Sequence, residues 1–130
     1  MEEKSEKMIT ISPNNIIKFV HGDTIEKAPI FIDCTNDETS TAFKYIVREN
    51  DKILFSIMEA NQDFNEGIIR KIFTKDDLDE NGNLLFSLDS SDSLNVLSGT
   101  YSYSIKLVQI RDEKVIASTI ITKTKLYILE

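Results

Sequence analysis

The stretch that decides the fold of this chain is Leu94-Asn95-Val96-Leu97-Ser98-Gly99-Thr100-Tyr101-Ser102-Tyr103-Ser104-Ile105-Lys106-Leu107. A leucine-containing turn is followed by a glycine and then by a long alternation of large apolar and small or polar side chains. Successive side chains of a strand point to opposite faces, so the alternation predicts a strand over 100–110. Its inward face would carry Tyr101, Tyr103, Ile105 and Leu107. The preceding turn or single helical turn, 90–97, is expected to carry Leu94 and Leu97 inward.

The residues around Tyr101 resemble the start of strand F in an immunoglobulin-like domain. There a tyrosine hydroxyl bonds back to the preceding backbone and fixes the corner where the chain crosses between two sheets. Tyr101 would be this structural tyrosine corner, with Gly99 as the turn residue before it. Tyr103 stands where antibody domains place the second disulfide cysteine, and Cys34 is the only cysteine of the chain. The fold is therefore expected without a disulfide.

The rest of the chain has the same period of two, and helical spacing does not persist beyond about one turn. Turn residues divide it into about eight or nine short strands, at spacings typical of a sandwich. We therefore predict an all-β, immunoglobulin-like antiparallel β-sandwich. The turns include Gly22-Asp23 and Asn81-Gly82, which tolerate positive φ. The extended segments expected are 8–11, 16–20, a strand after Pro29 with Ile30, Ile32 and Cys34 on one face, 43–47, 53–59, 68–74, 84–88, 100–110, 115–122 and 126–129.

Length and composition indicate one domain. The chain has 130 residues, of which 41% are hydrophobic and 28% charged, as is typical of a globular protein. We expect a flexible N-terminal arm over 1–7 and a single domain over 8–130. No apolar run approaches the roughly 18 residues of a membrane span, and the charged start lacks the apolar core of a signal peptide. Synthesis in the cytoplasm and no membrane partner are expected.

The charge balance argues against nucleic acid as a partner. Lys and Arg number 15 against 22 Asp and Glu, a net charge of −7, whereas binding to phosphates needs a concentrated positive face. From Leu97 onward, however, five basic residues face three acidic ones. This asymmetry is consistent with copies or neighbours that dock end to end.

One segment has ligands at the spacing of a calcium loop. Asp77, Asp79 and Asn81 carry oxygen atoms at alternate positions before Gly82, as in the first half of a twelve-residue loop. The twelfth position is Leu88, which supplies no carboxylate. Asn81-Gly82 between apolar runs is also a strong turn signal. We favour a turn, keep these three residues as a weak calcium candidate, and expect no other metal and no cofactor.

Residues suited to catalysis are sparse. His21 is the only histidine, so a catalytic triad or a multi-histidine zinc site would depend on it, and its neighbours favour a turn. Cys34 has no activating partner nearby and is expected to be a buried thiol. The chain has no tryptophan for a sugar platform, which leaves Tyr45, Tyr127 and Phe64. We predict that the protein is not an enzyme.

Several segments taken in order look like the N-terminal domain of the baseplate upper protein family of Gram-positive phages. They are 19–24, the strand after Pro29, 43–47, Asn81-Gly82 and 97–103, and the resemblance spans roughly 16–129. It implies a structural module of a phage or prophage tail, located in the virion or a tail-like particle after assembly. Its partners would be other tail or baseplate proteins, or a second copy. The alternative is a carbohydrate- or calcium-dependent binding module with an immunoglobulin-like fold.

Overall fold

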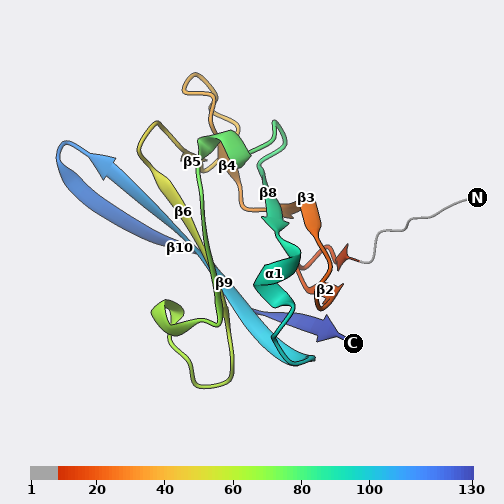
Figure 1. Cartoon of the computed structure of the whole chain (residues 1–130). Coiled ribbons are helices and arrows are strands. Elements are labelled where there is room, and N and C mark those ends of the chain that lie inside the picture. Colours follow the sequence, from red (N-terminus) through yellow and green to blue (C-terminus); the bar gives the residue numbers. More distant parts are fainter. Residues whose placement is uncertain (1–8) are drawn as a thin grey trace, which may run out of the picture.

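The computed structural model describes residues 9–130, which form an all-β sandwich (Figure 1). The expected arm over 1–7 lies outside the described residues. The strands are β1 (Thr10–Ile11), β2 (Ile17–Val20), β3 (Ile25–Phe31), β4 (Cys34–Thr35), β5 (Tyr45–Ile46), β6 (Lys52–Met58), β7 (Ile69–Phe73), β8 (Asn83–Leu88), β9 (Gly99–Arg111) and β10 (Lys114–Leu129). The short helices are η1 (Phe64–Glu66), η2 (Lys75–Asp77) and α1 (Ser90–Ser93). In this part of the chain, no helix has the length and apolar character needed to cross a bilayer.

Two layers build the sandwich. One is a six-stranded sheet in the order β1-β2-β10-β9-β6-β7, and β3 with β8 forms the layer that packs against it. β9 lies between β6 and β10 in this sheet. The predicted all-β sandwich class is confirmed, with ten strands in residues 9–130 instead of the eight or nine expected. The antiparallel prediction is wrong in two places, because β2 pairs parallel with β10 and β4 pairs parallel with β5.

Aromatic rings fill the space between the layers. Phe55 of β6 lies 4.6 Å from Phe86 of β8 and 5.4 Å from Tyr103 of β9, measured between ring centroids. Tyr103, Ile105 and Leu107 are fully buried, and Tyr101 is nearly so, as the alternation in β9 predicts. Ile30, Ile32 and Cys34 are also buried together. Burial of this apolar surface is the main stabilising contribution to such a fold.

The C-terminal part of the chain differs from the prediction. Segments 115–122 and 126–129 are expected to be separate, but both belong to the 16-residue strand β10. Two register shifts, between Thr119 and Ile121 and between Ile121 and Thr124, absorb the extra residues as bulges. Lys123 has φ 43°, and its N–H donates to Ser104 Oγ at 2.8 Å, which holds the irregular stretch against β9.

The inward placement of Leu94 and Leu97 is wrong, since these side chains are 54% and 81% exposed. The helical turn exists as α1, but it is Ser93 that is buried, and its hydroxyl accepts the Gly22 N–H at 2.8 Å. The backbone of Leu97, rather than its side chain, meets the core, because its carbonyl accepts the Tyr101 hydroxyl at 2.7 Å.

Two further strand expectations need adjustment. Pro29 stands within β3, which begins four residues earlier, at Ile25. It is tolerated because, among residues 9–130, β3 pairs with β8 alone and is an edge strand. The expected strand 43–47 is reduced to Tyr45–Ile46, with Val47 buried just beyond it.

Candidate docking surface

The six-stranded sheet has one face turned away from the β3–β8 layer, and we call it the outer face. Its side chains alternate along the strands with buried ones such as Ile53, Phe55 and Leu107. Strand register brings its members into adjacent rows, Ile72–Leu54–Lys106–Thr119, Lys52–Val108–Ala117 and Ile110–Val115. Ile72 is 63% and Val115 70% exposed. Apolar side chains that are exposed or partly exposed to solvent therefore lie on the edge strand β7 and on the neighbouring strands β6, β9 and β10.

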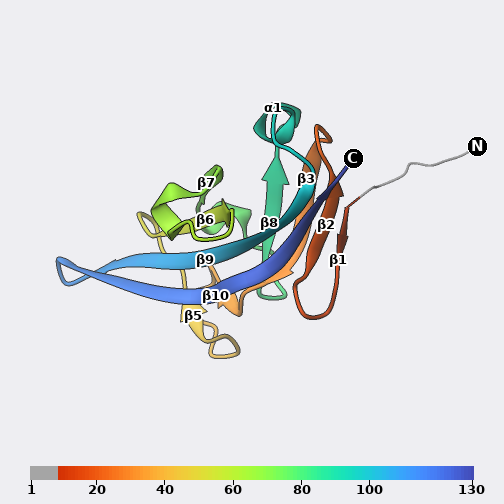
Figure 2. The same ribbon diagram turned by 90° about the horizontal axis from the view of Figure 1, so that it is seen from below.

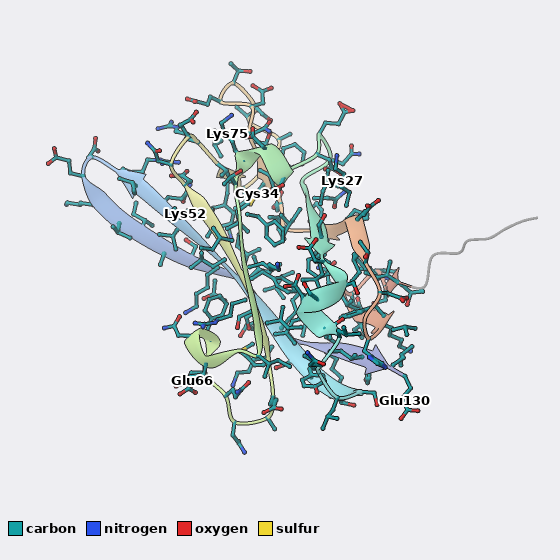
Figure 3. The ribbon with its side chains drawn as sticks, viewed as in Figure 1. Lys27, Cys34, Lys52, Glu66, Lys75 and Glu130 are labelled. Atoms are coloured by element: carbon teal, nitrogen blue, oxygen red, sulfur yellow. The ribbon has the colours of Figure 1, made fainter. Side chains whose placement is uncertain are left out.

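The charged side chains at the outward positions of β6, β7 and β9 are all of one sign. Lys52, Arg70 and Lys106 occupy outward positions of β6, β7 and β9, and no carboxylate stands in the rows given above. Figure 3 places Lys52 near the beginning of β6. The Lys106 ammonium lies 4.7 Å from the centroid of the Phe64 ring, a cation–π contact. In a chain of net charge −7, this face is therefore a basic, apolar exception.

The loop that contains η1 covers one end of the outer face. Ser56 Oγ donates to the Phe64 carbonyl at 2.7 Å, which fixes the loop on β6. Gly67 is needed for this approach, because a Cβ there would stand 2.0 Å from Ser56 Oγ and 2.6 Å from the Ile57 carbonyl oxygen. Between this loop and β7 lies a hollow of about 520 Å³, lined among others by Phe64, Arg70, Ile72 and the carboxylate-bearing Asp92. The remainder of the face, toward the β9–β10 turn, is open.

The end of the β9–β10 hairpin extends beyond β6 as an arm, residues 109–116 (Figure 2). β6 begins at Lys52, which pairs with Val108, so β9 has no β6 partner beyond that point. The arm ends in a two-residue turn with φ of 52° at Asp112 and 66° at Glu113, as a type I′ turn requires. Ile110, Val115 and Ile116 are the apolar residues of the arm, and all three are exposed; its other five residues are polar or charged.

Comparison of the chain with protein-family models, with curated proteins and with solved structures gave no match. The surface itself is therefore the basis for assigning a function.

The residues predicted to form the tyrosine corner and the turns occupy structural positions. The Tyr101 hydroxyl lies 2.7 Å from the Leu97 carbonyl oxygen, and Gly99, with φ 156°, is the first residue of β9. Gly22 has φ 80° in the turn closed by the Asp23 N–H, which donates to the Val20 carbonyl. Gly82 has φ 85°, and a Cβ there would meet the Phe43 ring at 2.7 Å.

The calcium candidate residues bind the local backbone. Asp79 Oδ1 accepts the N–H groups of Asn81 and Asn83 at 2.8 and 2.9 Å, and its Oδ2 accepts the Asn83 amide at 2.9 Å. Partial burial opposes ionisation of Asp79, but these hydrogen bonds outweigh it and lower its pKa. Asp77 Oδ2 accepts the Thr74 N–H at the start of η2. Within residues 9–130, no three acidic, histidine or cysteine side chains gather as a metal site would require.

The three aromatic side chains considered as sugar platforms lie on separate parts of the molecule, β5, β10 and η1. Each carries a lysine ammonium over its ring, Lys44 over Tyr45, Lys18 over Tyr127 and Lys106 over Phe64. A platform for a sugar ring would need these faces to be open.

Cys34 and His21 do not form a reactive pair. The Cys34 thiol, at the start of β4 (Figure 3), is buried and donates to the Ile32 carbonyl at 3.4 Å. Burial, together with the charge of Asp33, raises its pKa to about 12, so the thiol stays protonated. His21 joins the turn after β2, where its N–H donates to the Leu129 carbonyl; its Nδ1 is buried without a hydrogen-bond partner among the described residues.

Sequence reasoning missed the outer face and the arm. One signal was present, because Leu107 and Val108 are adjacent apolar residues, followed by Ile110. Strict alternation with a polar outward face would have placed polar residues at Val108 and Ile110. Apolar residues on both faces of one strand are the departure from this pattern that the sequence shows.

Proposed function

We propose that this protein is a non-catalytic docking module whose outer face binds a neighbouring protein in a larger assembly. The observation that carries the proposal is the exposure of Ile72, Ile110 and Val115 on one sheet face, with the partly exposed Leu54 and Val108 on the strands between them. Single exposed apolar residues are common on soluble proteins and need no explanation, whereas contiguous patches rimmed by polar groups mark interaction sites.

The charges of the outer face define the chemistry of the partner. Lys52, Arg70 and Lys106 would meet carboxylates at the rim of the partner surface, and its apolar centre would cover Leu54 and Val108. Electrostatic complementarity of this kind chiefly raises the association rate and selects the partner, and salt weakens it. Binding should therefore slow at high ionic strength without being abolished.

The assembly we propose is a phage or prophage tail, with other tail or baseplate proteins as partners. The resemblance of 19–24 and 97–103 to the N-terminal domain of baseplate upper proteins supports this context. A small rigid sandwich with an extended arm and an uncovered face suits a scaffold whose subunits pack side by side. The protein would be made in the bacterial cytoplasm and end in the particle.

The test is to fractionate particles from a bacterium that expresses the tagged chain from its own locus and to inspect them by negative-stain electron microscopy. We expect the wild-type chain to sediment with tail-like particles. Ile72→Glu places a charge in the outer face and should leave the chain in the soluble fraction. Leu97→Glu, at a more exposed leucine away from this face, is the matched control and should still sediment. A wild-type chain absent from all particles would refute the tail assignment.

A further inference from the structure

We infer that the free edge of β10 pairs with the same edge of a second copy, as two antiparallel strands centred on Ala117. The inference does not depend on the proposed docking function, because it uses the edge of the sheet rather than its outer face. β10 pairs with β9 along its length, but β2 covers its other side only from Leu126 to Leu129. Within the described residues, the stretch from Lys114 to Lys125 therefore has one open edge.

The hairpin turn fixes which backbone groups point out of this edge. In a two-residue hairpin, Arg111 and Lys114 form the hydrogen-bonded pair next to the turn, and the pattern alternates from there. Val115, Ala117 and Thr119 then direct their N–H and C=O groups away from β9. The other side of the arm shows the same phase, because the Ile110 N–H points away from β10 and donates to Asp51 Oδ1 at 3.2 Å. Three donors and three acceptors thus stand in a row on the edge.

A two-fold axis through Ala117 satisfies all of these groups. Val115 of one copy pairs with Thr119 of the other, Ala117 pairs with its own equivalent, and each outward N–H finds a carbonyl. Natural edge strands usually carry a charge, a proline or a bulge that blocks such pairing. The run Val115–Thr119 has no charged residue or proline, and the bulges of β10 begin only after Thr119.

The charges flanking this run favour a second copy over other strands. Asp112 and Glu113 lie four to five positions from Ala117 toward the turn. On the other side, Ala117 pairs with Val108 of β9, and Lys125 pairs with Ser102, six positions further along β9. The two bulges therefore place Lys125 about six positions from Ala117 along the edge, and Lys123 lies nearer to Ala117. The antiparallel two-fold therefore sets the acidic turn of each copy beside Lys123 and Lys125 of the other, while Lys114 faces the uncharged Ile120. Interfaces with two-fold symmetry need this kind of self-complementarity.

Cysteine cross-linking tests the register. The axis places Ala117 opposite its equivalent in a hydrogen-bonded pair, about 5.5 Å apart between Cα atoms, within the range of a disulfide. Ala117→Cys should give a covalent dimer under mild oxidation. Val115→Cys, whose equivalent would lie about four residues away along the strand, should give far less. Native Cys34 is buried and should not contribute. Equal cross-linking of the two variants, or none, would overturn the inference.

Ultracentrifugation of the purified chain tests the association itself. Ala117→Pro removes one outward N–H without removing a hydrogen bond to β9, and should raise the dimer dissociation constant at least tenfold relative to Ala117→Val.

The double variant Asp112→Asn, Glu113→Gly creates the best type I′ turn sequence but removes the acidic tip; it should keep or raise stability and still weaken the dimer at low salt. A wild-type chain that stays monomeric at several hundred micromolar, or identical constants for the proline and valine variants, would refute the dimer. Ile72→Glu, on β7 at the far edge of the sheet, should leave the dimer intact. Loss of particle binding by this variant with an unchanged dimer therefore separates a test of the docking proposal from a test of the dimer.

Discussion

The guanidinium of Arg111 binds both carboxylate oxygens of Asp51, with Nη1–Oδ1 and Nη2–Oδ2 distances of 2.9 and 2.8 Å. Asp51 is only 3% exposed, and its Oδ1 and Oδ2 also accept the N–H groups of Ile110 and Arg48. The carboxylate thus satisfies the β9 backbone at the point where β6 has ended. This contact anchors the base of the arm to the loop before β6.

Replacing Asp51 with alanine should lower the free energy of unfolding by about 2–4 kcal/mol, because a half-buried guanidinium and two backbone donors lose their acceptor. Chemical denaturation measures the loss. Glu49→Ala, an exposed carboxylate in the same loop with no side-chain hydrogen bond among the described residues, should change stability by less than about 0.5 kcal/mol. Equal effects of the two substitutions would contradict this role of Asp51.

Acid should destabilise the fold through Asp51. Burial opposes its ionisation, but hydrogen bonds from Arg111 and from the backbone of Arg48 and Ile110 prevail and lower its pKa. A carboxyl whose pKa is lower in the folded state stabilises that state fully above the unfolded pKa, about 3.9. The contribution is lost as the pH falls through the lower, folded value. Unfolding free energies measured from pH 6 down to pH 2 should fall less steeply for Asp51→Asn than for wild type, with Glu49→Gln as the control.

Removing the Tyr101 hydroxyl should weaken the corner between the layers. Tyr101→Phe keeps the ring in the core but leaves the Leu97 carbonyl without its donor, at a cost of about 1 kcal/mol. Tyr127→Phe is the matched control, since the Tyr127 hydroxyl makes no hydrogen bond among residues 9–130. Thermal unfolding should show a lower midpoint for the first variant only. A shift of the same size in both would mean that the corner bond adds nothing specific.

Gly67→Ala should destabilise the loop on the outer face by about 1–3 kcal/mol, because the added methyl group overlaps Ser56 Oγ and the Ile57 carbonyl. Ser56→Ala removes the nearer of these atoms, so the double variant should lose less stability than the sum of the two single variants. A double-mutant cycle measured by urea denaturation gives this coupling. Strict additivity would show that the two residues do not compete for the same space.

Sequence patterns within a few residues predicted the strand faces and turns whose structure depends on the residues at those positions alone. The alternation from Tyr101 to Leu107 specified a buried strand face, and Gly82 marked a turn with positive φ. The exposure of Leu97 was not predictable in this way, because hydrophobicity alone places a leucine inside. Its position depends on the Tyr101 hydroxyl, which draws the Leu97 backbone inward.

Features that join distant segments left no local signal. Asp51 belongs to a polar stretch that resembles an ordinary hairpin loop, and its burial depends on Arg111, sixty residues later. The continuity of β10 was missed because Thr122, Lys123 and Thr124 interrupt the apolar pattern, whereas β9 supplies a partner through both bulges. The outer face could be detected only from strand register, which brings Ile72 and Val115 onto one surface.

The segment that resembles a calcium loop should depend on Asp79 without responding to calcium. Asp79 holds the turn by accepting two backbone N–H groups and one side-chain amide, so Asp79→Ala should cost about 1–2 kcal/mol. Glu80→Ala, at the exposed neighbour, should be nearly neutral. Both Asp79 oxygens are already hydrogen-bonded and Leu88 replaces the bidentate carboxylate, so millimolar calcium should leave the thermal midpoint of the wild type unchanged. A calcium-induced rise in the midpoint that Asp79→Ala abolishes and Glu80→Ala retains would show that the turn is a metal site after all.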